Sequence, residues 1–328
     1  MFLKFIKKYD LLGLFLIPLA GILLWYRSFQ SPPSIEGFAN IGVMPLYALI
    51  MSSMKDMAFW QVISGFILVL ANSFLITRIC SSFILFKKGS PLPGIIYLLV
   101  VSSWKVLQTL HPVHFATLCI LITLFYIFDT YQKELEISFT FNASFLLALA
   151  SMFYLPAAIL LPLIWISVFI LQKSDNWRLL FVPVFGFIVP WLFLFSFAFM
   201  SDTLGKLIST LNVIIWAANG GYLMDPLFLT MSAFMGFLML LGTISFLTFY
   251  QYFKVSSRKF FVVFYWMLAI IGISALSFST IGIEVVALVT IPASFLISIF
   301  FLSGTKTFWK ETIFFLFLVL IVFAHFYM

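Results

Sequence analysis

Long apolar runs separated by short polar stretches alternate along the whole 328-residue chain. A helix needs about 20 apolar residues to cross a bilayer. The runs are continuously apolar rather than alternating with polar residues, which favours helices over the strands of a transmembrane barrel. About eleven runs come near the required length: 11–26, 59–79, 93–104, 113–128, 138–154, 156–172, 179–200, 227–250, 260–278, 285–302 and 312–327.

This pattern predicts an all-α protein, a polytopic transmembrane helical bundle with about 11 spans that forms a single transmembrane domain over residues 1–328. Two longer segments, 27–58 and 201–226, are predicted as loops on the outer side. Within the second, residues 204–217 are expected to form an interfacial or re-entrant helix, ended by the turn at Asn219-Gly220-Gly221.

The composition excludes a water-soluble protein. Hydrophobic residues make up 64% of the chain, charged residues only 9%, and the mean hydropathy is +1.18, whereas ordinary globular chains carry about 25% charged residues. The two cysteines, Cys80 and Cys119, fall in or beside predicted spans and have no metal-ligand spacing. They are interpreted as buried thiols, and the 44 Phe residues as lipid-facing bulk.

The positions of the basic residues predict the orientation. With eleven spans, 14 of the 18 Lys and Arg residues fall on one side and four on the other. Cytoplasmic loops carry the excess of Lys and Arg, so the N-terminus is predicted to be cytoplasmic and the C-terminus periplasmic. The net charge of +7 therefore reflects membrane orientation, and no nucleic-acid partner is expected.

Most candidate chemistry lies on the predicted outer side. Few ionisable residues fall in the middle of a span, which argues against a pump or an ion-coupled carrier. Glu36 stands in the first outer loop with no basic residue within eight positions. It is a candidate general base, and the alternative interpretation is a solvated loop acid.

The sequence His111-Pro112-Val113-His114 places two imidazoles one helical turn apart. Such a pair could share a metal, but no third ligand lies nearby in the sequence. His111 is better interpreted as the cap of the following span, with Pro112 in its first turn. Lys105 and Lys206 are candidates for binding a phosphate, or for reaching lipid headgroups. No metal and no cofactor are expected.

The order of these features resembles the GT-C superfamily of membrane glycosyltransferases that use polyprenyl-phosphate sugars. Glu36 is followed by Pro45-Leu46-Tyr47, where the family often shows an acid followed by HPPLYY. The stretches FILVLANSFLITRICSSF, LQTLHPVHFATLCILITLFYIFD and FLLALASMFYLPAAILLPLIWI are similar to its second span, its second outer loop with the next helix, and its paired spans. The layout is similar to the protein O-mannosyltransferase branch, and also to a bacterial family of Phe-rich multispan proteins that implies no activity.

The resemblance implies a multi-pass protein of the bacterial inner membrane. Its expected activity is the transfer of a sugar, with mannose favoured, from a polyprenyl phosphate to a protein or glycolipid acceptor on the outer face. Membrane lipids and membrane proteins are further expected partners. The implied roles are Glu36 as catalytic base, Arg27, Lys105 and Lys206 as ligands of the donor phosphate, and Tyr47, His111 and His114 as donor or acceptor contacts.

Two other functions stay open at the level of sequence. The first outer loop offers a single acid where the family commonly has two, which favours a non-catalytic subunit or scaffold of an envelope or secretion complex. The third interpretation is a transporter of lipid-linked sugars.

Overall fold

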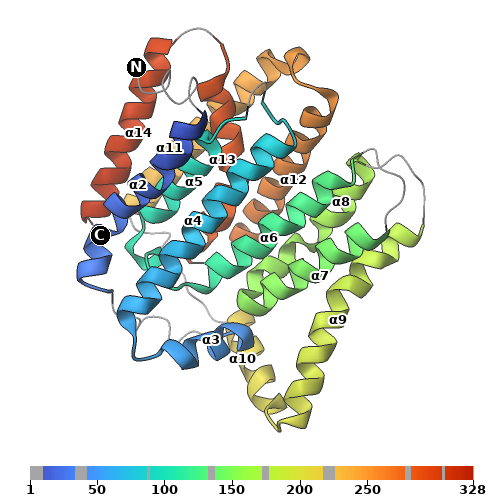
Figure 1. The fold of residues 1–328 in the computed structure, drawn as a ribbon. Helices are drawn as coiled ribbons and strands as arrows, with labels where there is room; N and C mark the ends of the chain where they lie inside the picture. Colours follow the sequence, from blue (N-terminus) through green and yellow to red (C-terminus); the bar gives the residue numbers. More distant parts are fainter. Residues whose placement is uncertain are drawn as a thin grey trace.

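The computed structural model describes residues 10–33, 43–86, 89–131, 137–171, 177–216, 226–277, 282–304 and 307–327 (Figure 1). Within these ranges the regular structure is entirely helical, and no strand occurs. The all-α prediction is thus confirmed. Glu36, the predicted base, lies outside the described residues.

Eight of the described helices are long and apolar enough to cross a membrane. The chain is therefore a multi-pass membrane protein. These helices are α2 (Asp10–Gln30), α4 (Ala58–Ser82), α6 (Pro112–Asp129), α9 (Arg178–Met200), α11 (Pro226–Thr248), α12 (Val255–Ser277), α13 (Val285–Leu302) and α14 (Thr307–Tyr327).

The other three predicted spans fall on shorter apolar helices. These are α5 (Leu92–Ser102), α7 (Ile137–Phe153), and the 3-10 helix η2 (Leu155–Leu160) with its continuation α8 (Leu161–Leu171). Two one-turn 3-10 helices complete these connections, η1 (Lys105–Leu107) and η4 (Tyr250–Tyr252).

The two predicted outer loops are partly helical. Helix α2 continues through Arg27 to Gln30, and α3 (Pro45–Met54) forms within the segment predicted as a loop. Pro45 occupies the first turn of α3, where a backbone N–H would have no intrahelical acceptor, so the missing N–H of proline costs no hydrogen bond. The apolar residues after it are good helix formers. In the second segment, α10 (Leu204–Trp216) confirms the helix expected there.

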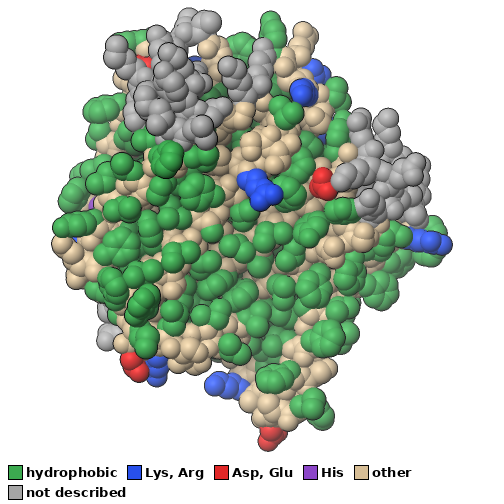
Figure 2. Space-filling view, in the orientation of Figure 1, with side chains coloured by type: hydrophobic (Ala, Val, Ile, Leu, Met, Phe, Trp, Pro, Cys, Tyr) green, Lys and Arg blue, Asp and Glu red, His purple; other side chains and the backbone are tan. Residues whose placement is uncertain are grey.

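Helices α5 and α13 form the centre of the bundle. Every residue of α5 is buried, and α13 packs along both α5 and α11. By contrast, α9 and α14 bury only 22% of their apolar windows. Large side chains such as Phe193, Phe197 and Phe315 are mostly exposed on them, as expected for helices that face lipid. Figure 2 shows one such face, covered mainly by hydrophobic side chains, with charged ones in its upper part and at its lower edge.

Contacts between helix ends define two opposite ends of the bundle. The α3 end, at the bottom of Figure 1, joins the end of α2 and the starts of α3, α6 and α13 through the contacts Ser28–Gln108, Tyr47–Leu110 and His111–Glu284. The other end joins the end of α4, the end of α6 and the start of α12 through Ser257–Ile84 and Lys259–Tyr131. It is named the basic end because it carries Arg78, Lys254, Arg258, Lys259 and Lys310.

Candidate functional site

The connection between α5 and α6 is a buried loop, residues 103–111. Eleven residues of α5 rise about 16 Å, about half of the roughly 30 Å hydrocarbon core. A Cβ added at Gly65 would overlap the carbonyl of Thr109 in this loop. Gly65 lies two helical turns inside α4, so the loop lies below the end of the bundle rather than on its surface.

Polar side chains join the buried loop to the helices around it. From the loop, Gln108 donates through Nε2 to the carbonyl oxygens of Ser102 at the end of α5 and of Leu24 on α2, the second at 3.3 Å. The Tyr47 hydroxyl donates to the Leu110 carbonyl at 2.6 Å. Non-helical backbone at membrane depth is tolerated only where such partners are available or where the backbone lines a wet cavity. The loop is therefore built by specific side chains, as functional sites in membranes are.

His111 ends the buried loop as the N-cap of α6. Its Nδ1 accepts a hydrogen bond from the Val113 N–H at 3.2 Å, and Pro112 takes the first helical position. The capping role predicted from the sequence is confirmed. Because Nδ1 is an acceptor here, a neutral His111 carries its proton on Nε2.

The Nε2 atom of His111 lies 3.6 Å from Oε1 of Glu284, at the start of α13. The His111 side chain is 1% exposed and that of Glu284 is 16% exposed. The carboxylate thus has a sealed imidazole on one side and access to solvent on the other. Gly282 provides the room, since an added Cβ would lie 2.5 Å from Glu284 Oε2.

The surroundings keep Glu284 ionised. Burial raises the pKa of its carboxyl. His111 and the backbone N–H groups of Gly282 and Glu284 lower this pKa by more than burial raises it, so the net pKa is below the ordinary value. Burial and the negative charge of Glu284 together raise the pKa of Tyr154, which follows α7, well above its ordinary value. At neutral pH this site therefore contains a carboxylate that can accept a proton and a phenol that retains one.

A cluster of positive charge lies at the same end of the bundle. Arg27 on α2 and Lys105 on η1 both lie close to His325 near the end of α14. Gln108 joins this cluster to the buried loop, because its Nε2 lies 3.3 Å from His325 Nδ1 and its Oε1 accepts a hydrogen bond from Ser28. Arg27 is exposed and Lys105 half-buried, so the cluster is accessible to an anion.

A polar track continues from the loop into the bundle. His114 donates from Nε2 to the Leu107 carbonyl at 2.8 Å. Asn72 on α4 donates to the His114 carbonyl at 3.1 Å and lies 3.5 Å from the hydroxyl of Tyr97 on α5. Buried polar atoms that find no hydrogen-bond partner, such as His114 Nδ1 and Asn72 Oδ1, are uncommon in native interiors.

The structure brings together most of the residues predicted from the sequence. Tyr47, His111 and His114 surround the buried loop, and Arg27 and Lys105 lie in the cluster beside it. Lys206 does not join them, since it is exposed on α10, a helix that packs on α9.

Four further residues take part that sequence reasoning did not assign to the site: Gln108, Tyr154, Glu284 and His325. In the sequence, Glu284 lies between the predicted spans 260–278 and 285–302, and the predicted orientation places this turn on the outer side with His111. That shared side is the only signal for their pairing, because the two residues lie in different halves of the chain.

The His111 and His114 rings have centroids 6.1 Å apart, and each ring uses one nitrogen in a hydrogen bond to the backbone. Among the described residues, no three His, Cys, Asp or Glu side chains are grouped so that they could hold a metal. In this arrangement Glu284 can accept a proton, and Arg27 and Lys105 can bind an anion.

No family model, curated protein or solved structure matches this chain.

Proposed function

We propose that this protein is a membrane glycosyltransferase that moves a sugar, with mannose favoured, from a polyprenyl phosphate to a protein or glycolipid acceptor at the α3 end. One observation carries the proposal: the carboxylate of Glu284 and the cations Arg27 and Lys105 lie at the same end of the bundle, linked through the buried loop. A base and a phosphate-binding cluster are the two groups that this reaction requires.

In this reaction Glu284 takes the proton of the acceptor hydroxyl as its oxygen attacks the anomeric carbon of the sugar. The bond from that carbon to the phosphate oxygen breaks, and its electron pair leaves with the phosphate. Arg27 and Lys105 stabilise the charge that develops on the departing group. His111 orients the carboxylate from its sealed side. The donor carries one phosphate, so two cationic side chains suffice and no metal is needed.

Glu36 is a second candidate for the base. It follows α2 in the sequence, and α2 ends beside the cationic cluster. We assign the role to Glu284 because its carboxylate lies 3.6 Å from the buried imidazole of His111 and still reaches solvent.

The proposed orientation places the α3 end outside and the basic end in the cytoplasm of a bacterial inner membrane, in accord with the positive-inside rule. In this proposal the eleven crossings are the eight long helices together with α5, α7 and η2–α8. The N-terminus is then cytoplasmic and the C-terminus periplasmic.

A second candidate function is transport of a lipid-linked sugar. The specific observation in its favour is that helix α5 is short and is followed by the buried loop, since helices that end within the membrane often form the binding sites of transporters. A subunit without activity of its own is the remaining alternative.

The experiment that tests the proposal uses the purified protein in liposomes with radiolabelled polyprenyl-phosphate mannose and an acceptor extract. Wild-type protein transfers label, and the double variant Arg27→Gln, Lys105→Gln transfers it at least about tenfold more slowly, as expected when charge-assisted contacts to phosphate are lost. Lys55→Gln is the matched control, because Lys55 is an exposed lysine at the same end. Translocation of the donor without transfer would favour the transporter, and neither activity would favour the subunit.

A further inference from the structure

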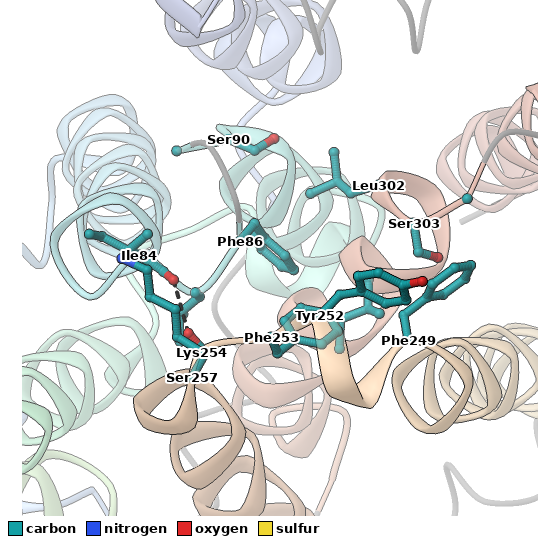
Figure 3. A pocket seen from close by; sticks show the side chains of 14 residues that line it. Ile84, Phe86, Ser90, Phe249, Tyr252, Phe253, Lys254, Ser257, Leu302 and Ser303 are labelled. Carbon is teal, nitrogen blue, oxygen red and sulfur yellow. Dashed lines mark hydrogen bonds between the residues drawn. The ribbon is translucent and has the colours of Figure 1, made fainter.

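A cavity of about 600 Å³ opens at the basic end, remote from the buried loop. Three parts of the chain line it (Figure 3): the residues around the connection from α4 to α5, the connection from α11 to α12 including η4, and the end of α13. This volume lies within the range of about 300–1,000 Å³ that is typical of small-molecule sites.

The lining combines aromatic and polar groups. Phe86, Phe249, Tyr252 and Phe253 supply ring surface from two of the three segments. Lys254 supplies a charge, and Ser90 and Ser303 supply hydroxyl groups. None of the described lining residues is acidic. The cavity is thus suited to an amphipathic molecule with a negative group.

One helix N-terminus adds to the positive potential at the cavity. Helix α12 begins at Val255, directly after Lys254. The first N–H groups of a helix have no intrahelical partner, and the helix dipole makes that end favourable for anions. The start of α5 contributes less, because its Leu92 N–H already donates to Ser90 Oγ at 3.3 Å and Pro93 has no N–H. The lysine, the cavity and the start of α12 therefore favour the same kind of ligand.

The wall of the cavity beside α12 is held in place by Arg258. Its Nε donates to the Phe253 carbonyl at 3.0 Å and its Nη2 to the Gln251 carbonyl at 3.0 Å, while the guanidinium lies 4.5 Å from the centroid of the Tyr250 ring. Ser257 fastens this wall to the segment after α4 by donating to the Ile84 carbonyl at 3.0 Å (Figure 3). Hydrogen bonds therefore fix the α12 side of the cavity.

We propose that this cavity binds an anionic membrane phospholipid. The phosphate of the headgroup lies against Lys254 and the start of α12, and the first part of an acyl chain lies against Phe86, Phe249 and Phe253. A lipid is the occupant because the aromatic lining needs an apolar partner and the basic end of this membrane protein faces the headgroups of one leaflet. This site is separate from the glycosyl-transfer site proposed at the α3 end.

Native mass spectrometry of the detergent-purified full chain tests the proposal, with phosphatidylglycerol or phosphatidylcholine of identical acyl chains added. Phosphatidylglycerol is expected to bind at least fivefold more tightly than phosphatidylcholine. Lys254→Gln is expected to lower its affinity about fivefold, which corresponds to the roughly 1 kcal/mol that one lysine contributes at an anionic membrane surface. Lys55→Gln, an exposed lysine at the opposite end, is the matched control and leaves binding unchanged.

Two further experiments distinguish binding of a lipid from binding of a free anion and from a nonspecific effect of the substitution. Inorganic phosphate at millimolar concentration does not displace phosphatidylglycerol if the acyl chain contributes to binding. Leu302→Trp, which fills the cavity from α13, removes binding while thermal unfolding in detergent stays cooperative. Equal affinity for the two lipids, an unchanged affinity in Lys254→Gln, or full displacement by phosphate would each overturn the proposal.

Discussion

His111 Nε2 lies 3.6 Å from Glu284 Oε1, although one residue begins α6 and the other precedes α13. The contact joins the end of the buried loop to the start of the most buried long helix of the bundle. It joins an imidazole that is 1% exposed to a carboxylate that still reaches solvent. The proposed chemistry depends on this pair.

The pair predicts how stability depends on pH. The folded-state pKa of Glu284 is lower than its ordinary value of 4.5, so the ionised carboxylate stabilises the folded protein at neutral pH. This contribution is complete above 4.5 and is lost as the pH falls through the folded-state pKa. The difference in Tm between wild type and Glu284→Gln is therefore expected to change between pH 7 and pH 3.5, with wild type losing more. Scanning fluorimetry in detergent measures the two Tm values. A difference in Tm that does not change with pH would show that the pKa of Glu284 is not lowered in the folded protein.

Gly65 is predicted to be required for the buried loop. A Cβ at this position overlaps the Thr109 carbonyl, so Gly65→Ala forces the loop away from α4 at a cost of about 1–3 kcal/mol. Gly236→Ala on α11 is the matched control, because no atom lies within 4 Å of its added Cβ. In that helix the change is neutral or stabilises by up to about 1 kcal/mol. Thermal unfolding of both variants decides this, and equal stability would show that the loop does not pack on α4 as described.

The orientation predicts opposite accessibility of the two ends. Lys55 at the α3 end and Lys254 at the basic end are both exposed, and the native thiols Cys80 and Cys119 are both buried. A membrane-impermeant maleimide added to intact spheroplasts is expected to label Lys55→Cys and not Lys254→Cys. Permeabilisation is expected to expose the second thiol. The reverse pattern would invert the proposed topology and remove Glu284 from the outer face.

Much of the helical framework is predictable from the sequence. Apolar runs identify α2, α4, α6, α9 and α11–α14, because a bilayer requires about 20 consecutive apolar residues. The His111 cap is equally predictable, since Pro in the first helical position leaves the preceding residue to satisfy the N–H groups of the next turn. Such local rules need no knowledge of tertiary structure.

The site itself is less predictable, because long-range contacts produce it. Gln108 has the composition of an ordinary loop residue, yet it bonds to Leu24, Ser102 and Ser28 and approaches His325. Helix α3 lies within the segment 27–58, which is predicted as a loop because it is not continuously apolar. The Tyr47–Leu110 hydrogen bond joins this helix to the buried loop. Neither contact leaves a signal in local sequence spacing.

The rate of mannosyl transfer by Glu284→Gln in proteoliposomes shows whether Glu284 is the base. Loss of a general base typically slows a reaction by about 10²–10⁴-fold, so we expect at least a hundredfold decrease. Asp202→Asn is the matched control, because Asp202 is an exposed acid in the turn before α10. Its backbone has a positive φ, and asparagine adopts that conformation as readily as aspartate does. A wild-type rate in Glu284→Gln would show that Glu284 is not the base, and loss of transfer in Glu36→Gln would then assign that role to Glu36.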